Sequence, residues 1–326
     1  MDLFAGAGGL SLGAQYAGAR LVASVNHWQR AVDTHALAFP DAQHFCEDAA
    51  VLNPLVLPEH SFLAAAPSCT GHTRARGVEQ PHHDAARATA WCVIRVAEPH
   101  RPRVIVCENV PELRRWECYR AWRMALNDLG YVLSETVLDA ADCGVPQHRV
   151  RLFVVAVHRT VLGVRAGREA DTLGVVIPAP SEPHVACRTV IDTDPFVGPH
   201  TAAWRPWRDL CTNTVNAIRA ARWLHGDDAF LVPYYGASRD RGWSLDRPIG
   251  TLTTHDRYAV VVGDVMRMLS VDELTRLMGF PADYPLQGTR ADRVKQIGNA
   301  VCPPAGAWVV SHALRAAGLL PSGVAS

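Results

Sequence analysis

Short apolar runs alternate along the chain with longer segments of helical character. The runs 21–25, 62–66 and 104–107 are almost wholly apolar, which is typical of strands buried on both faces. Helices are expected between them, one of them from about Asp84 to Val96, with Pro99 and Pro102 ending it. The alternation predicts an α/β fold built on a doubly wound, mostly parallel sheet.

Two reactive groups follow such strands directly. Cys69 comes after the run 62–66 and a proline, and Glu108 and Asn109 come after the run 104–107. Ligands of open α/β sheets bind beyond the carboxyl ends of the strands, so a thiol and a carboxyl group there can face one ligand. A single cysteine is more often a small buried residue, and only the other motifs in the chain favour a catalytic role for Cys69.

A glycine-rich segment opens the chain. Asp2, Phe4, Gly6, Gly8 and Gly9 fall where a short first strand turns into a helix, with only Met1 before Asp2. Glycines let the backbone approach a ligand closely, and the helix N-terminus exposes amide groups. The pattern predicts a site for an adenosine-like cofactor, and a plain tight turn is the alternative.

The next two strand ends carry further candidates. Asn26 occupies the position where sheets of this type often carry an acid for ribose hydroxyls. His27 or Trp28 could stack on adenine or simply cap the surface. Asp48 follows a short strand at His44 and could accept from an adenine amino group, or cap a helix.

A pair of strands, 132–138 and 151–157, reads as a hairpin-like unit. The second strand is entered through Gln147, Arg149 and Arg151, which alternation places on one face, with His148 and Val150 on the other. Farther on, Ser270 and Glu273 form a capping box at the start of a helix over 271–278. Gly298 to Val301 is expected to begin the last helix.

Composition excludes some classes of protein. Lysine and arginine together number 32, as do aspartate and glutamate, so no overall charge indicates a polyanion partner. The nine cysteines contain no C-x-x-C pair, which disfavours a zinc site and a disulfide framework. No signal peptide or membrane-spanning run is recognisable, so we expect a cytoplasmic protein without a metal and without a membrane partner.

The order of these motifs resembles the DNA (cytosine-5) methyltransferases, over about 1–157 and 245–310. The matching segments are Asp2 to Gly9, Pro67-Ser68-Cys69, Glu108-Asn109-Val110, Gln147-x-Arg149-x-Arg151, Arg247-Pro248 through Thr253, Glu273 through Pro281, and Gln296 through Val301. Each alone is weak, but together and in this order they are highly specific.

The resemblance implies a Rossmann-like methyltransferase fold that uses S-adenosylmethionine. Cys69 would attack carbon-6 of a cytosine flipped out of the duplex, and Glu108 would bind its N3 edge. Arg151 would hold the cytosine O2 and Arg149 would brace the catalytic loop, with Asn109 completing the catalytic set. The cofactor site would comprise Asp2, Phe4, Gly6, Gly8, Gly9, Asn26, His27, Asp48, Ser68 and Asn299.

Three residues depart from the family pattern. Ser68 and Thr70 flank the cysteine where the family has proline and glutamine, and Asn26 replaces the ribose-binding acid. Serine loosens a turn that proline would fix. The changes concern rate, cofactor affinity and substrate, and leave the reaction class unaltered.

Outside the matching segments the chain loses the family pattern. We expect a catalytic domain over 1–158, a small irregular target-recognition domain over 159–246, and a return to the catalytic domain over 247–326. DNA contacts are expected from Thr73, Arg74, Arg76, Arg239 and Arg241.

Double-stranded DNA is the expected partner of a monomer, with a cognate restriction endonuclease as a further partner. The alternatives are an RNA cytosine-5 methyltransferase of the same fold and a catalytically weak DNA-binding relative.

Overall fold

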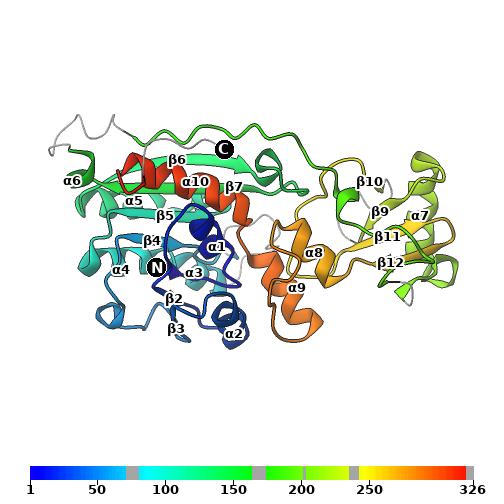
Figure 1. The fold of residues 1–326 in the computed structure, drawn as a ribbon, viewed down its shortest axis with the longest axis horizontal. Coiled ribbons are helices and arrows are strands. Elements are labelled where there is room, and N and C mark those ends of the chain that lie inside the picture. The colour runs from blue at the N-terminus through cyan, green and yellow to red at the C-terminus, as the bar shows by residue number, and fades with distance from the viewer. Residues whose placement is uncertain (71–80, 164–173, 201–202, 235–241, 321–326) are drawn as a thin grey trace.

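The computed structural model describes residues 1–70, 81–163, 174–200, 203–234 and 242–320. Two bodies lie side by side along the long axis of the molecule (Figure 1), each built on its own sheet. Helices α8 (Val271–Leu277) and α9 (Arg290–Asn299) lie between them (Figure 1). Among the described residues, no helix is long and apolar enough to cross a membrane.

The first body contains a seven-stranded sheet with the order β3-β2-β1-β4-β5-β7-β6. All neighbours are parallel except β7, which runs antiparallel to both β5 and β6. This confirms the mostly parallel sheet and the hairpin-like pair. Its strands are β1 (Asp2–Leu3), β2 (Ala23–Val25), β3 (Gln43–Phe45), β4 (Phe62–Ala65), β5 (Val104–Asn109), β6 (Tyr131–Asp139) and β7 (Val150–His158).

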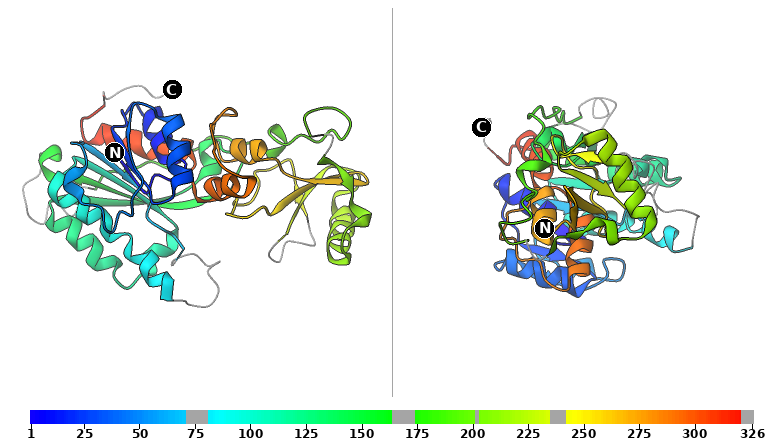
Figure 2. Two further views of the ribbon diagram at one scale, coloured as in Figure 1. Left: turned by 90° about the horizontal axis from the view of Figure 1, so that it is seen from below. Right: turned by 90° about the vertical axis from the view of Figure 1, so that its right-hand side faces the viewer.

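Helices cover both faces of this sheet, as the left view of Figure 2 shows. Alternate strand residues point to opposite faces, so Val104 and Val106 join one core whereas Ile105 and Cys107 join the other. The first core contains α1 (Gly9–Tyr16) and α10 (Pro303–Ala316), and the second contains α4 (Trp91–His100) and α5 (Tyr119–Asp128). The sheet is therefore doubly wound, as predicted.

The remaining helices are short or lie at the edges. They are α2 (Gln29–Ala38), α3 (Pro81–Ala88) and α6 (Arg159–Leu162), with the 3₁₀ turns η1 (Pro54–Val56), η3 (Pro111–Arg115), η4 (Ala140–Cys143), η6 (Cys187–Thr189) and η8 (Trp207–Asp209). The helix expected from Asp84 to Val96 is in fact two helices, α3 and α4, and α4 contains Pro99. Pro99 has no N–H to donate to the carbonyl of Arg95, and the helix ends one residue after it, at His100.

The second body is more regular than expected. Five antiparallel strands have the order β10-β9-β11-β12-β8, and α7 (Thr212–His225) packs on them through Ile218 and Ala221. The strands are β8 (Arg205–Pro206), β9 (Phe230–Pro233), β10 (Trp243–Ser244), β11 (Tyr258–Val262) and β12 (Val265–Met268). The sheet continues beyond residue 246, because β11 and β12 pair with β9 and β8. The expected boundary at 246/247 thus falls inside this body.

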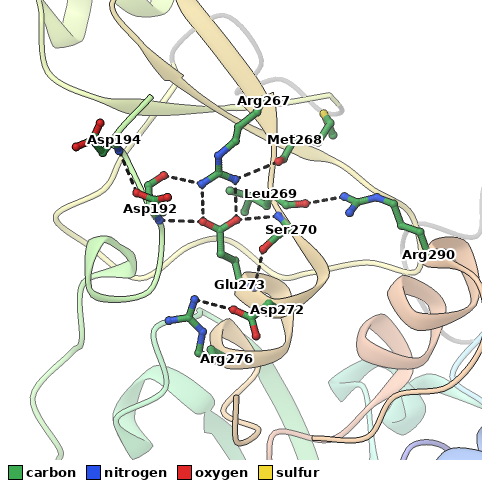
Figure 3. A network of polar contacts seen from close by, with 10 residues as sticks. All are labelled: Asp192, Asp194, Arg267, Met268, Leu269, Ser270, Asp272, Glu273, Arg276 and Arg290. Atoms are coloured by element: carbon green, nitrogen blue, oxygen red, sulfur yellow. Dashed lines mark hydrogen bonds and ion pairs between the residues drawn. The ribbon is translucent and has the colours of Figure 1, made fainter. Parts of the chain in front are cut away.

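A buried ion pair joins β12 to α8 (Figure 3). The guanidinium of Arg267 donates to both carboxylate oxygens of Glu273, at 2.8 and 2.6 Å, and also to the carbonyl oxygen of Asp192. Glu273 accepts as well from the backbone N–H of Ser270, which confirms the predicted capping box. Burial alone would raise the pKa of Glu273, but the hydrogen bonds from Arg267 and Ser270 outweigh it and lower that pKa. The network connects the second sheet to the helices between the bodies.

Candidate active site

A cavity of about 330 Å³ opens at the carboxyl ends of β1, β2, β4 and β5. The end of α9 and the segment that follows it close the opposite wall. Eleven of the predicted site residues line this one cavity: Asp2, Phe4, Gly6, Asn26, His27, Ser68, Cys69, Glu108, Arg149, Arg151 and Asn299. The edge of the sheet predicted from the strand ends is therefore where the structure brings them together.

Cys69 lies on a segment that is tied to its neighbours by two hydrogen bonds. Asn109 donates its side-chain amide to the Pro67 carbonyl at 3.0 Å, and the Ser68 N–H donates to Thr89 Oγ1 at 3.0 Å. Proline at position 68 could not make the second bond, because it has no N–H. The hydrogen bond to Thr89, which no sequence motif indicated, therefore depends on the serine at position 68.

The charges of Arg151, Glu108 and Arg149 affect the pKa of the Cys69 thiol. Burial raises the pKa of Cys69, the Arg151 guanidinium opposes the rise, and Glu108 adds to it. Burial also raises the pKa of Glu108, against the opposing charges of Arg151 and Arg149. Arg151 Nε lies 3.0 Å from Glu108 Oε1, and both side chains are largely buried. The wall therefore presents a thiol, a carboxyl group with a raised pKa and a guanidinium to one ligand.

Arg149 makes contacts different from those expected. It is buried and donates to the carbonyl oxygens of Leu252, Gly298 and Ala300. Its described hydrogen bonds therefore hold the segments after β10 and at the end of α9, rather than the segment of Cys69. Desolvation lowers its pKa to about 10, so the group stays cationic near neutrality. Burial agrees with the predicted alternation at the strand entry, since Gln147 and Arg149 are buried whereas His148 and Val150 are more exposed.

The other end of the cavity has the features that a cationic adenosyl cofactor requires. Asp2 is buried, and its Oδ1 has no hydrogen-bond partner among the described residues. Phe4 and Gly6 both have positive φ, 65° and 54°, and a Cβ at Gly6 would meet no atom closer than 4.0 Å. An orphaned carboxylate oxygen and an open stretch of backbone fit a ligand with donor groups and positive charge.

Asn26 and Trp28 form the rim of this end. Asn26 Oδ1 accepts from the Trp28 N–H at 2.9 Å, so the side-chain NH₂ and the second lone pair of Oδ1 remain for a ligand. Lys295 Nζ lies 4.5 Å from the centre of the Trp28 ring, an arrangement typical of a cation–π contact. Lys295 is the single lysine of the chain and was missed, because no local pattern relates α9 to the strand end at Trp28.

Four predicted residues do not line the cavity. Gly8 and Gly9 are needed for packing, because a Cβ at Gly9 would overlap the backbone of Val301. Asp48 is exposed and accepts from the N–H of Ala50, which is a local turn. Asn109 is buried and donates its side-chain amide to the carbonyl of Pro67.

The segment from Gly298 to Val301 does not begin a helix. It contains the last two residues of α9 and the start of the link to α10, and a Cβ at Gly298 would overlap the backbone of Thr253. Five further candidates, Thr73, Arg74, Arg76, Arg239 and Arg241, lie outside the described residues. No cluster of metal-ligating side chains occurs in the described part of the chain.

Comparison with known proteins identifies the family of this chain. The model of the C-5 cytosine-specific DNA methylase family matches residues 1–168 and 216–313. The chain therefore belongs to this family and is a DNA cytosine-5 methyltransferase, for which S-adenosylmethionine is the methyl donor.

Among named relatives, the Type II methyltransferase M.HgiDI of Herpetosiphon aurantiacus is 29% identical over 92% of this chain and 89% of its own length. M1.HphI of Haemophilus parahaemolyticus is also 29% identical, over 96% of this chain and 86% of its own length. These relatives belong to restriction–modification systems.

Two solved structures share the fold. One is a putative DNA modification methyltransferase encoded within a prophage of E. coli, with a TM-score of 0.68, 22% identity and coverage of 95% of this chain and 97% of its own. The other is a DNMT2 mutant of Spodoptera frugiperda, with a TM-score of 0.63, 15% identity and coverage of 97% and 98%. At these identities the likeness concerns the fold alone.

Proposed function

We propose that this protein methylates carbon-5 of a flipped-out cytosine in a specific DNA sequence, through a covalent adduct with Cys69. The observation that carries the proposal is the convergence of Cys69, Glu108 and Arg151 on one wall of the cavity that also contains Asp2 and Asn299. The RNA alternative has less support, because the family model and the named relatives are DNA methyltransferases.

Cys69 supplies the nucleophile. Carbon-5 of cytosine reacts poorly with electrophiles until a sulfur–carbon bond forms at carbon-6 and the displaced ring electrons reach carbon-5. The thiol proton has to leave first, and burial makes that unfavourable in the free protein. The Arg151 charge opposes this effect, so the arginine promotes the reactive thiolate.

Glu108 and Arg151 hold the base and its developing charge. Attack at carbon-6 raises electron density on N3, where a protonated Glu108 can donate its proton. The raised pKa of Glu108 keeps this acid form available closer to neutral pH. Arg151 braces the same carboxyl group and can donate to the cytosine O2, so one guanidinium orients both acid and base.

Methyl transfer requires a donor at the other end of the cavity. S-adenosylmethionine supplies a methyl group on a positively charged sulfur, and Asp2, Phe4, Gly6, Asn26, His27, Ser68 and Asn299 would hold it. Afterwards a base removes the carbon-5 proton, the sulfur–carbon bond breaks with its electron pair on sulfur, and the N3 proton returns to Glu108, which restores the aromatic ring and releases Cys69 as a thiolate. The stacked duplex blocks this route, so the base has to leave the helix.

Target choice belongs to the second body under this proposal. Arg239 and Arg241 are the proposed readers: a bidentate guanine contact contributes about 1–3 kcal/mol of discrimination, whereas a phosphate contact affects all sequences alike. Bisulfite sequencing of a random-site library would separate the two roles for Arg239→Ala and Arg241→Ala. A relaxed motif identifies a base reader, and a uniform, salt-dependent loss identifies a phosphate contact.

The proposal is tested by bisulfite sequencing of DNA from a methylation-free strain that expresses the protein. Methylated cytosines in one short motif are expected with the wild type and none with Cys69→Ser. Methylation of tRNA in place of DNA would favour the RNA alternative. Binding of DNA without methylation by the wild type would favour the non-catalytic relative.

A further inference from the structure

A chain of hydrogen bonds leads from the cofactor end of the cavity through the protein. Ser11 Oγ donates to Asp2 Oδ2 at 2.6 Å, and His35 Nε2 lies 2.9 Å from the same Ser11 Oγ. His35 Nδ1 lies 2.9 Å from Nε2 of His44. Asp2, Ser11 and His35 are buried, whereas His44 on β3 is partly exposed. The chain thus joins a carboxyl group in the cavity wall to the edge of the sheet.

Asp2 is poised between its two charge states. Burial raises its pKa to about 6, although the Ser11 hydrogen bond and the Met1 amino group oppose the rise. Its second oxygen, Oδ1, has no hydrogen-bond partner among the described residues. Asp2 itself is one of the residues that line the cavity. A positive charge bound in the cavity beside Asp2 would stabilise its ionised form through the electrostatic attraction between the two charges.

Each member of the chain can both donate and accept, so the chain can run in two directions. With Asp2 ionised, His44 donates to His35, His35 donates to Ser11, and Ser11 donates to Asp2. With Asp2 protonated, the same bonds run the opposite way and end at His44. Passing from the second state to the first moves one proton per bond and releases one proton to water from His44, without moving a heavy atom.

His35 is suited to relaying a proton and unsuited to storing one. Burial, together with the neighbouring His44, lowers its pKa to about 3, so the ring stays neutral near physiological pH. Ser24 Oγ, 3.3 Å from Nδ1, is the remaining polar contact of the ring. A neutral imidazole with one donor and one acceptor nitrogen completes the path between Ser11 and His44.

Two other titratable groups interact with Asp2, so their titration has to be distinguished from the titration of Asp2. The buried Met1 amino group donates to the Phe62 carbonyl, and burial lowers its pKa to about 6. Tyr284, before α9, feels the Asp2 charge and donates to the carbonyl of Ala7. Burial raises the pKa of Tyr284, so this phenol stays neutral, and only Met1 titrates in the same range as Asp2.

The geometry points to Asp2 as the residue that balances the positive charge of the cofactor, and to Ser11, His35 and His44 as the path by which its proton leaves. This inference rests on the proposed function, because it takes S-adenosylmethionine as the ligand of the cavity. The cationic sulfur and ammonium groups favour ionised Asp2, so binding lowers the pKa of Asp2. Between the free and bound pKa values, binding releases a proton, and affinity falls as the pH drops through the free value.

Calorimetry of S-adenosylmethionine binding to the full chain tests the charge balance. Titrations at one pH in two buffers of different ionisation enthalpy report the number of protons released. We expect about half a proton at pH 6, almost none at pH 8, and a Kd about tenfold higher at pH 5 than at pH 8. Asp2→Asn should abolish both the release and the pH dependence. Proton release that survives in Asp2→Asn would assign it to Met1 and overturn the inference.

Ser11→Ala tests the path, because it removes one relay atom and leaves Asp2 in place. The lost hydrogen bond should raise the pKa of Asp2 and move the release to higher pH. In stopped-flow experiments at pH 6, a dye should report the proton later than the intrinsic tryptophan fluorescence reports binding. His60→Gln is the control, since His60 is another largely buried histidine whose pKa burial lowers, to about 4, and it does not line the cavity. Simultaneous proton and fluorescence signals in Ser11→Ala would show that the proton leaves through the cavity.

Different results would overturn the proposed function and the proposed role of Asp2. Absence of S-adenosylmethionine binding to the wild type at pH 8 would overturn the proposed function. Binding with an unchanged Kd from pH 5 to pH 8 and no proton release would overturn only the role of Asp2. Circular dichroism of Asp2→Asn and Ser11→Ala confirms that a loss of binding does not reflect unfolding.

Discussion

Arg151 Nε lies 3.0 Å from Glu108 Oε1, across the two antiparallel strands β5 and β7. Glu108 is directly opposite Phe153, so Arg151 is its diagonal neighbour on the same face of the sheet. Segments more than forty residues apart in the chain thereby place an acid and a guanidinium at one cavity wall. The pair is held by the sheet itself, which gives both groups a rigid support.

Glu108→Gln tests the acid role of this pair. Glutamine keeps the shape and can still donate a hydrogen bond, but it cannot transfer a proton to N3, so kcat should fall about 10²–10⁴-fold. Because burial raises the pKa of Glu108, wild-type activity should decline as the pH rises through that value and the acid form is lost. The decline should be absent from the residual activity of Glu108→Gln. An unchanged kcat would contradict the assignment, and Glu117→Gln at an exposed site is the control.

Cys69→Ser should abolish methyl transfer while cofactor binding stays nearly intact. A hydroxyl is close in size to a thiol but is a far weaker nucleophile at neutral pH. Wild-type protein should form a denaturation-resistant complex with DNA containing 5-fluorocytosine only when S-adenosylmethionine is present, since fluorine cannot leave as a cation. The exposed Cys118→Ser variant should trap normally. Residual activity above a few per cent in Cys69→Ser would rule out the covalent route.

Asn26→Asp should tighten the binding of S-adenosylmethionine. Aspartate can keep the acceptor for the Trp28 N–H and adds a charged acceptor for a ribose hydroxyl. A charged acceptor contributes roughly 1 kcal/mol more than a neutral one, which corresponds to about fivefold in Kd. Calorimetry measures the change, with Asn26→Ala as the comparison that removes both groups. Unchanged or weaker binding by Asn26→Asp would mean that the ribose is held elsewhere.

Thr89→Val should weaken the support of the Cys69 segment. The variant leaves the Ser68 N–H without its acceptor, at a cost of about 1 kcal/mol in the free energy of unfolding and a lower kcat. In a Ser68→Pro background the N–H is already absent, so the additional effect of Thr89→Val should be smaller. Chemical denaturation of the four proteins gives the coupling energy. Additive effects would exclude this bond as a support of the Cys69 segment.

Glu273→Gln should destabilise the protein severely. Removing the charge leaves the buried Arg267 guanidinium without its counter-ion, which typically costs about 3–5 kcal/mol. Asp272→Asn on the same helix breaks only the exposed pair with Arg276 and should cost less than about 1 kcal/mol. The pKa of Glu273 is lowered in the folded state, so its contribution is present above the unfolded pKa and is lost as the pH falls through the folded one. Equal midpoints of thermal unfolding in the two variants would contradict the role of the buried pair.

Local pattern alone was sufficient for the parts of the protein that depend on neighbours in the chain. Apolar runs identified β4 and β5, and their ends located Cys69 and Glu108, because parallel strands end at a common edge. Alternation predicted that Gln147 and Arg149 share one side, and the capping box at Ser270 follows from two residues three positions apart. Family motifs in their order added the reaction class.

The tertiary structure decided what depends on close approach between distant segments. Gly9 could be interpreted as a cofactor contact until the backbone of Val301, nearly three hundred residues away, was found against it. The same holds for Arg149, whose carbonyl partners come from Leu252, Gly298 and Ala300. Such contacts produce no recognisable sequence pattern in either segment, because the local pattern of each segment depends only on its own secondary structure. Hydrogen-bond direction, burial and the charge of Asp2 therefore emerge only when the chain is folded.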